Sequence, residues 1–297
     1  MQFITAVLIA CTIIFCKSVF AHSQELVIPP SGFIYCGKTG RVEHLEEVAR
    51  LAHPGAVIII SEIHDNVQHH EHQVSLLETV ARLAPEQSLN VGMEFIPFTR
   101  QAAVDNFLLG KIDEKTFKEE VTWKGNFDFY RTQILFPASH QGKTIALNAP
   151  SELTSKISRM GLASLTTDEK VLLPPHFELG NKAYFERFKQ VMESSHPLPE
   201  EKLQHYFEAQ SVWDDTMAWT AAQYMRGFPN AVLIIIVGDF HVQYGGGLPD
   251  RLIARGVQQL MTISQVDVTG LSQSEIDALV LPDAHWGQRA DFVWTSD

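Results

Sequence analysis

Two stretches of the chain resemble each other and constrain the fold more than any other feature of the sequence. Residues 56–64 read Ala-Val-Ile-Ile-Ile-Ser-Glu-Ile-His, and residues 231–241 read Ala-Val-Leu-Ile-Ile-Ile-Val-Gly-Asp-Phe-His. A run that is apolar at every position is typical of a strand buried on both faces, as in a parallel sheet covered by helices. Each run leads to a small residue, an acid, an apolar residue and a histidine, so two histidines are expected just past the carboxyl ends of central strands. Ligands bind at that edge of open α/β sheets.

The order of the remaining patterns predicts the fold class. A third strand is expected at 89–95, ending in Glu94, and helical patterns alternate with strands in both flanks of the chain. Between 151 and 230 only helical patterns remain. We therefore predict an α/β fold with a mostly parallel β-sheet flanked by helices, formed by residues 41–150 and 231–297, with an all-helical insertion at 151–230.

Several local patterns predict individual elements. Residues 42–52 have helical spacing throughout, and residues 200–226 form the longest helical pattern, with apolar residues at steps of three and four. Residues 292–294 predict a final strand at the edge of the sheet. His69 and His72 share one face of the helix that follows the first central strand, and we expect them at its solvated start.

The composition is typical of a folded globular protein and argues against nucleic acid as a partner. Charged residues make up 20% and hydrophobic residues 45% of the 297 residues. The formal net charge is −12, and the sequence has no cluster of Lys and Arg of the kind that binds phosphates.

The beginning of the chain predicts export. Residues 3–20 are almost wholly apolar. We interpret residues 1–21 as a signal peptide cleaved after Ala21, which leaves a mature domain of residues 22–297 in the periplasm or outside the cell. Two alternatives stay open: a lipoprotein whose mature chain begins at an acylated Cys11, and an uncleaved membrane anchor.

The acids and histidines at the strand ends form a candidate catalytic or metal site. His64, Glu94 and His241 are enough to bind a divalent metal such as Mn, Zn or Co with open positions. The same groups, together with Glu62, can act as general acid and base. The alternative is that each histidine only caps a helix or fills a polar position, and the recurrence of the motif favours a site.

A stripe of aromatic and polar residues lies on the longest helical pattern. Its members are spaced by three or four residues: Tyr206, Gln210, Trp213 and Met217. His205 and Asp214 lie beside it. A stripe of this kind is most often the buried face of a helix. Tyr, Met and His are also side chains that ligate or line haem, and an apolar groove would bury a porphyrin face, so a haem site is the alternative interpretation.

Several short motifs resemble those of the ChaN-like haem-binding uptake proteins. The motifs, in order along residues 57–252, are Glu62-Ile-His-Asp-Asn66 with His70 and Gln73, Gly92-Met-Glu-Phe95 with Gln101, Leu147-Asn-Ala-Pro150, Ala209-Gln-Ser-Val-Trp-Asp214 with Met217-Ala218, and Gly238-Asp-Phe-His-Val242 with Gly247-Leu-Pro249. That family is similar in turn to the Tiki and erythromycin-esterase superfamily, whose enzymes carry two Gly-x-x-His motifs and a glutamate that bind metal or act in hydrolysis. Ser61 stands where the superfamily has Gly.

The resemblance implies an exported bacterial protein that binds haem in a cleft and serves iron acquisition. It implies a tyrosine as iron ligand, a homodimer around the haem, and an outer-membrane haem or iron receptor as a further partner. The residues expected to bind the cofactor are Tyr206, Tyr184, His176, His205, Gln210 and Trp213. The motifs do not fix which tyrosine holds the iron; Tyr206 is our first choice and Tyr184 the second, with His176 and His205 as partners for iron or a propionate.

The same resemblance leaves two other functions open. The first is a metal-dependent hydrolase that uses the superfamily positions Glu62, His64, Glu94 and His241. The second is a scaffold whose ancestral site no longer acts. Convergence of His64, Glu94 and His241 would favour the metal site, and an apolar slot beside Tyr206 would favour haem.

Overall fold

The two similar stretches form neighbouring parallel strands at the centre of a sheet. These strands are β3 (Val57–Glu62) and β6 (Val232–Gly238), and every residue in both is buried. Glu62 pairs with Gly238 in their register, so both acid and histidine motifs begin at the same edge of the sheet.

Six further strands extend this pair on both sides. They are β1 (Ile34–Cys36), β2 (Val42–Glu43), β4 (Leu89–Pro97), β5 (Thr144–Asn148), β7 (Leu260–Asp267) and β8 (Phe292–Ser296). The computed structural model describes residues 32–195 and 198–297, and within them the strand order is β2-β1-β8-β7-β3-β6-β4-β5. The strands from β8 to β5 in this order are parallel, and β1 is antiparallel to β8 and β2. The predicted α/β class with a mostly parallel sheet is therefore confirmed.

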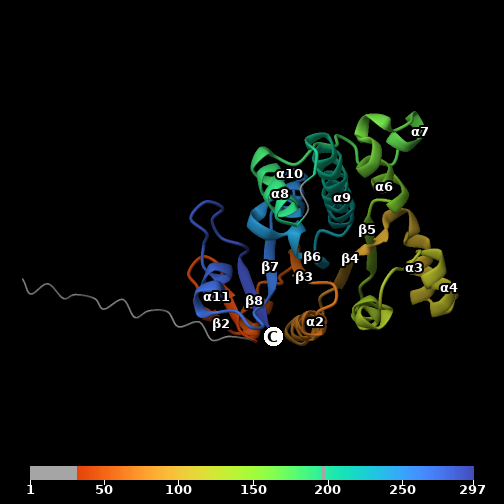
Figure 1. Cartoon of the computed structure of the whole chain (residues 1–297). Helices are drawn as coiled ribbons and strands as arrows, with labels where there is room; N and C mark the ends of the chain where they lie inside the picture. Colours follow the sequence, from red (N-terminus) through yellow and green to blue (C-terminus); the bar gives the residue numbers. More distant parts are fainter. Residues whose placement is uncertain (1–31, 196–197) are drawn as a thin grey trace, which may run out of the picture.

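Helices cover both faces of the sheet, and the alternation of side chains along the strands explains how (Figure 1). Ile58 and Ile60 point to one face, where the helices are α1 (Leu45–Ala49), α2 (Val67–Leu83), α3 (Gln101–Leu108), α4 (Glu114–Glu120) and α5 (Arg131–Leu135). Val57 and Ile59 point to the other face and pack on α9 (Glu200–Gly227) and α10 (Leu248–Ala254). Figure 1 shows α9 and α10 on the side of the sheet opposite α2.

The described residues between β5 and β6 form helices and loops only. The helices there, besides α9, are α6 (Ser151–Met160), α7 (Thr167–Lys170) and α8 (Lys182–Ser195). Both α6 and α8 pack on α9 through apolar clusters. Since α9 itself packs on the strands, it connects these helices to the sheet. The last helix, α11 (Gln273–Val280), packs on β1, β7 and β8. Short 3-10 helices complete the fold: η1 (Phe98–Arg100), η2 (Phe127–Phe129), η3 (Phe136–Ser139), η4 (Leu162–Ser164), η5 (Asp239–His241) and η6 (Gln243–Gly245).

Three local predictions are wrong. Strand β8 does not lie at the edge, because β1 pairs with it on the side away from β7. The stretch 42–52 is not helical throughout, since β2 occupies its first residues. His69 is not solvated: it is fully buried, its Nδ1 accepts from the Ile63 N–H at 2.9 Å, and its Nε2 lies 2.8 Å from Ser296 Oγ.

The predicted signal peptide, residues 1–21, lies outside the described residues. Among the helices that the structure does describe, none combines the length and the apolar character needed to cross a bilayer.

Candidate functional site

The ends of β3, β4 and β6 bring the predicted acids and histidines to one edge of the sheet. Glu94 accepts a hydrogen bond of 2.6 Å from the Gly238 N–H, and its other oxygen lies 3.4 Å from His241 Nε2. A Cβ on Gly238 would lie 2.9 Å from Cε1 of His64. Gly238 therefore lets His64 approach Glu94 and His241, which a larger residue would prevent. Ser61, at the matching position of the first motif, is buried and donates to Asp239 at 2.5 Å.

The imidazole of His241 is held between two carboxylates. Its Nδ1 lies 2.6 Å from Oδ1 of Asp214 on α9, and its Nε2 faces Glu94. Burial disfavours the imidazolium, but the charges of Asp214 and Glu94 and the hydrogen bonds to them outweigh burial and raise the pKa of His241 to about 10. Burial likewise opposes the ionisation of Glu94, yet the charges of His241 and His64 hold the pKa of Glu94 below its usual value. At neutral pH this part of the site is an ionised pair.

A second network surrounds Glu62. Its carboxylate is buried, accepts from Gln73 Nε2 at 2.5 Å and from the Tyr130 hydroxyl, and lies 3.0 Å from His64 Nδ1. The hydrogen bond to Glu62 raises the pKa of His64 above its usual value. His70 Nδ1 lies 3.4 Å from Glu62 without forming a hydrogen bond. Glu62 thus orients His64, whose side chain is 58% exposed.

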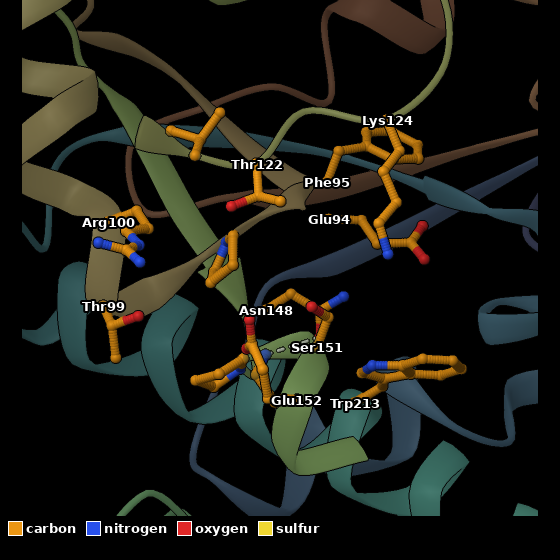
Figure 2. A pocket seen from close by; sticks show the side chains of 14 residues that line it. Glu94, Phe95, Thr99, Arg100, Thr122, Lys124, Asn148, Ser151, Glu152 and Trp213 are labelled. Carbon is orange, nitrogen blue, oxygen red and sulfur yellow. Dashed lines mark hydrogen bonds between the residues drawn. The ribbon is translucent and has the colours of Figure 1, made fainter. Parts of the chain in front are cut away.

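A cavity of about 360 Å³ opens beside Glu94. Its walls include the rings of Phe95 and Trp213, and its charged rim includes Arg100 and Lys124. Figure 2 shows Glu94, Lys124 and Trp213 on one side of the cavity and Arg100 on the other. The ring of His64 stands edge-on to Phe95, with 5.2 Å between the centroids, so the network at the strand ends adjoins this space.

The arrangement does not offer an evident metal centre. Within residues 32–195 and 198–297, no three His, Cys, Asp or Glu side chains are grouped so that they could hold one ion. Both nitrogens of His241 face carboxylates, and both oxygens of Glu94 face donors. His64, Glu94 and His241 do converge at this edge, which is the condition that favours a metal site, but His241 in its protonated form offers no lone pair to a metal.

The expected cofactor residues lie at different distances from this edge. Gln210 Nε2 lies 3.0 Å from His241 Nδ1, and Trp213 lines the cavity. Tyr184 is buried and is connected to His241 through Asp214, to which its hydroxyl donates at 2.8 Å. Tyr206 belongs to the same face of α9 as Gln210 and Trp213 but is 37% exposed and does not line the cavity.

The two histidines expected as partners for iron or a propionate lie outside the cavity. His176 is exposed in the loop between α7 and α8. His205 is half-buried against Gly161 at the end of α6, and its Nδ1 has no partner. Neither side chain lines the cavity.

Sequence reasoning missed three residues of the site. Tyr130, Arg100 and Lys124 come from short helices and loops between β4 and β5, and they belong to no periodic pattern. The concentration of aromatic residues at 123–130 was the only signal there, because a polar loop has no reason to carry four aromatic rings.

The fold and site define a class of α/β proteins in which two acid and histidine motifs end neighbouring parallel strands beneath a helical layer. The family model described as "Haem-binding uptake, Tiki superfamily, ChaN" matches residues 48–252. The chain therefore belongs to this haem-binding uptake family, as the motifs predict. No curated protein gives a match to the chain.

One solved structure shares this fold over most of its length. The structure titled "Cofacial heme binding to ChaN of Campylobacter jejuni" is 16% identical, has a TM-score of 0.65, and is matched over 88% of this chain and 95% of that chain. The erythromycin esterase EreC in its open conformation is 11% identical with a TM-score of 0.47, over 80% of this chain and 76% of that chain. The type III effector HopBA1 is 12% identical with a TM-score of 0.43, over 81% and 87%. At 16% identity the likeness to the first structure concerns the fold alone, and the other two likenesses are weaker.

Proposed function

We propose that this protein binds haem at the cavity beside Glu94 and along α9 from Trp213 toward the exposed Tyr206, and that it serves haem or iron uptake in the cell envelope. The cavity itself is the observation that carries the proposal. Phe95 and Trp213 offer apolar surface for a porphyrin face, while Arg100 and Lys124 offer cations for its two propionates. Membership of the haem-binding uptake family supports the same assignment.

The iron ligand in this proposal is Tyr206. The residues lining the cavity include no tyrosine, histidine, cysteine or methionine, so the ligand must come from its surroundings. Tyr206 is exposed on the same face of α9 as Trp213, seven residues away, which is about 10 Å along a helix. Tyr184 is a poorer choice, because burial and the charge of Asp214 raise its pKa well above the usual value and oppose the tyrosinate form.

Two further parts of the proposal concern assembly and location. An exposed iron ligand leaves one haem face open, which a second copy of the chain would cover in a homodimer. Export by the predicted signal peptide, residues 1–21, or a lipid on Cys11 would place the protein where an outer-membrane haem or iron receptor could deliver its cargo.

A haemin titration tests the proposal. We expect a saturable shift of the Soret band in the wild-type protein and a changed spectrum with weaker binding in Tyr206→Phe, which removes only the phenol oxygen. Tyr224→Phe is the matched control on the same helix, since the Tyr224 hydroxyl is committed to Asn90 at 2.6 Å. Size-exclusion chromatography with and without haemin reports the dimer.

The possible outcomes distinguish haem binding as the function from the identity of the residue that ligates the iron. Unsaturable haemin adsorption that no variant alters would contradict haem binding as the function. Saturable binding that survives in Tyr206→Phe but is lost in His64→Ala would retain the function and move the iron ligand to His64, whose Nε2 is turned away from Glu62.

A further inference from the structure

Arg187 on α8 is a buried cation without an acidic partner. Only 4% of its surface is exposed. Its guanidinium donates to the backbone carbonyls of Gln243 and Phe240, the latter at 3.2 Å, and its Nε has no partner. Among the residues that the structure describes, none of its hydrogen bonds or ion pairs involves a carboxylate. Asp239 and Asp214 act on its charge without contacting it, and both carboxylates are bound to other side chains, so the guanidinium has no direct counter-ion.

The surroundings of this guanidinium do not replace a counter-ion. Three rings stack near it, with 4.7 Å to Phe240, 5.2 Å to Tyr184 and 5.5 Å to Tyr244. Cation–π contacts stabilise a buried guanidinium by less than its burial costs. Burial lowers the pKa of Arg187 accordingly. The balance favours an anion that comes from outside the chain.

A second cavity, of about 200 Å³, lies against Arg187. Besides Arg187 it is lined by Tyr184, Tyr244, Trp286 and Asn181, and it shares no lining residue with the cavity beside Glu94. Its floor is the backbone of the glycine loop before α10, where a Cβ on Gly246 would lie 2.9 Å from the ring of Tyr184. The space beside the unpaired charge is thus formed by aromatic rings and a loop without side chains.

We propose that this second cavity binds a small organic carboxylate, whose charge pairs with Arg187 and whose apolar body lies between Tyr244 and Trp286. A carboxylate carries one negative charge, which one guanidinium neutralises, and it fits the planar donors of Arg in a bidentate manner. A phosphate dianion would leave a second charge among aromatic rings, because Arg289, the nearest other cation over Tyr244, is already paired with Asp239. The lining therefore favours a carboxylate over a phosphate.

The site is separate from the proposed haem site but contacts its supports. Tyr184 forms a wall of this cavity and donates to Asp214, the partner of His241. The carbonyls bound by Arg187 belong to the segment 240–243 that contains His241. A carboxylate bound in the second cavity would stabilise residues 240–243 through Arg187 and would not occupy the cavity beside Glu94.

Thermal unfolding of the haem-free protein tests the proposal, with sodium benzoate, sodium acetate and sodium phosphate as probes at constant ionic strength. We expect benzoate to raise Tm by several degrees in a saturable manner, acetate less, and phosphate no more than chloride. In Arg187→Met the benzoate effect should vanish. Arg82→Met, which removes an exposed Arg paired with Glu46, is the control for loss of one positive charge and should keep the effect.

Folding of the variant does not limit this test. Methionine is close in size to the arginine stem but leaves the Gln243 and Phe240 carbonyls without a donor, so the Tm of this variant should be lower and the benzoate shift is measured from the variant's own Tm. Trp286→Ala, on a surface turn, provides a second variant. In it the benzoate concentration that gives half of the maximal Tm shift should rise at least tenfold. A benzoate effect that is absent in the wild-type protein, equal for phosphate, or retained in both variants would overturn the proposal. Haemin spectra do not enter this readout, so failure here is distinct from failure of the haem proposal.

Discussion

His241 Nδ1 lies 2.6 Å from Oδ1 of Asp214, and this contact joins the end of β6 to the middle of α9. It ties the helical layer to the carboxyl edge of the sheet, where Glu94 contacts the other nitrogen of His241 at 3.4 Å. The imidazole is therefore a fixed cation that holds two acids in place. Through Glu94, which lines the cavity, it connects that wall to Asp214 on α9.

Removal of the Asp214 charge should lower the pKa of His241. In Asp214→Asn the remaining partner is Glu94, so the pKa should fall from about 10 toward its usual value. An NMR titration of the imidazole resonances measures this shift. Asp65→Asn, which removes an exposed acid near the site, is the control and should leave the resonance of His241 unchanged. An unaltered titration in Asp214→Asn would show that Asp214 does not hold the proton.

The same pair predicts a loss of stability at alkaline pH. The pKa of His241 in the folded state, about 10, lies above the value of 6.5 expected for the unfolded chain. The stability from this group is therefore complete below pH 6.5 and is lost as the pH rises through 10, by an amount of the order of several kcal/mol. Urea unfolding of the wild-type protein and of His241→Gln at pH 6, 8 and 10 should show free energies that converge as the pH rises. Parallel curves would contradict this.

His69 predicts the opposite behaviour in acid. Burial lowers its pKa to about 4, so the stability that comes from the neutral imidazole is lost as the pH falls from 6.5 through 4. His69→Asn retains an acceptor for the Ile63 N–H and has no group that titrates in this range. We expect the variant to be less stable than the wild type at pH 7, by about 1–3 kcal/mol, but to lose less stability between pH 6.5 and 4. Equal acid sensitivity in urea unfolding would refute this role of His69.

Gln101 protects the edge strand β5. Its side-chain amide donates to the Thr144 carbonyl at 2.9 Å and accepts from the Ala146 N–H at 2.8 Å, as a neighbouring strand would. Gln101→Glu keeps the size and loses the donor, so we expect a loss of about 1–2 kcal/mol and more aggregation through the free edge. Gln223→Glu, an exposed change on α9, is the matched control. Unchanged unfolding and light scattering in Gln101→Glu would count against this account.

The sequence was most informative where burial is complete. The apolar runs of β3 and β6 identified the central strands, and the acids and histidines that follow them meet at one edge as parallel register requires. The edge position of β8 was mispredicted because no local pattern in β1 or β2 indicates that β1 pairs with β8 and continues the sheet.

The site was predicted only in part, for a related reason. Glu94 and His241 end strands and so could be located, whereas Tyr130 reaches its place through the packing of short helices. The burial of His69 depends on Ser296 at the far end of the chain, which no local pattern reveals. Contacts between residues distant in sequence are set by the whole fold and not by spacing along one helix or strand.

The most direct test of the central claim is a crystal structure of the protein with haemin, in which anomalous scattering locates the iron. We predict one iron peak on the face of α9 that carries Tyr206 and Trp213, with the porphyrin edge at the cavity beside Glu94 and its propionates near Arg100 and Lys124. An iron peak elsewhere, such as the groove lined by Trp219, Tyr224 and Phe228, would contradict the site. The absence of any ordered haem from crystals of a saturated solution complex would contradict it as well.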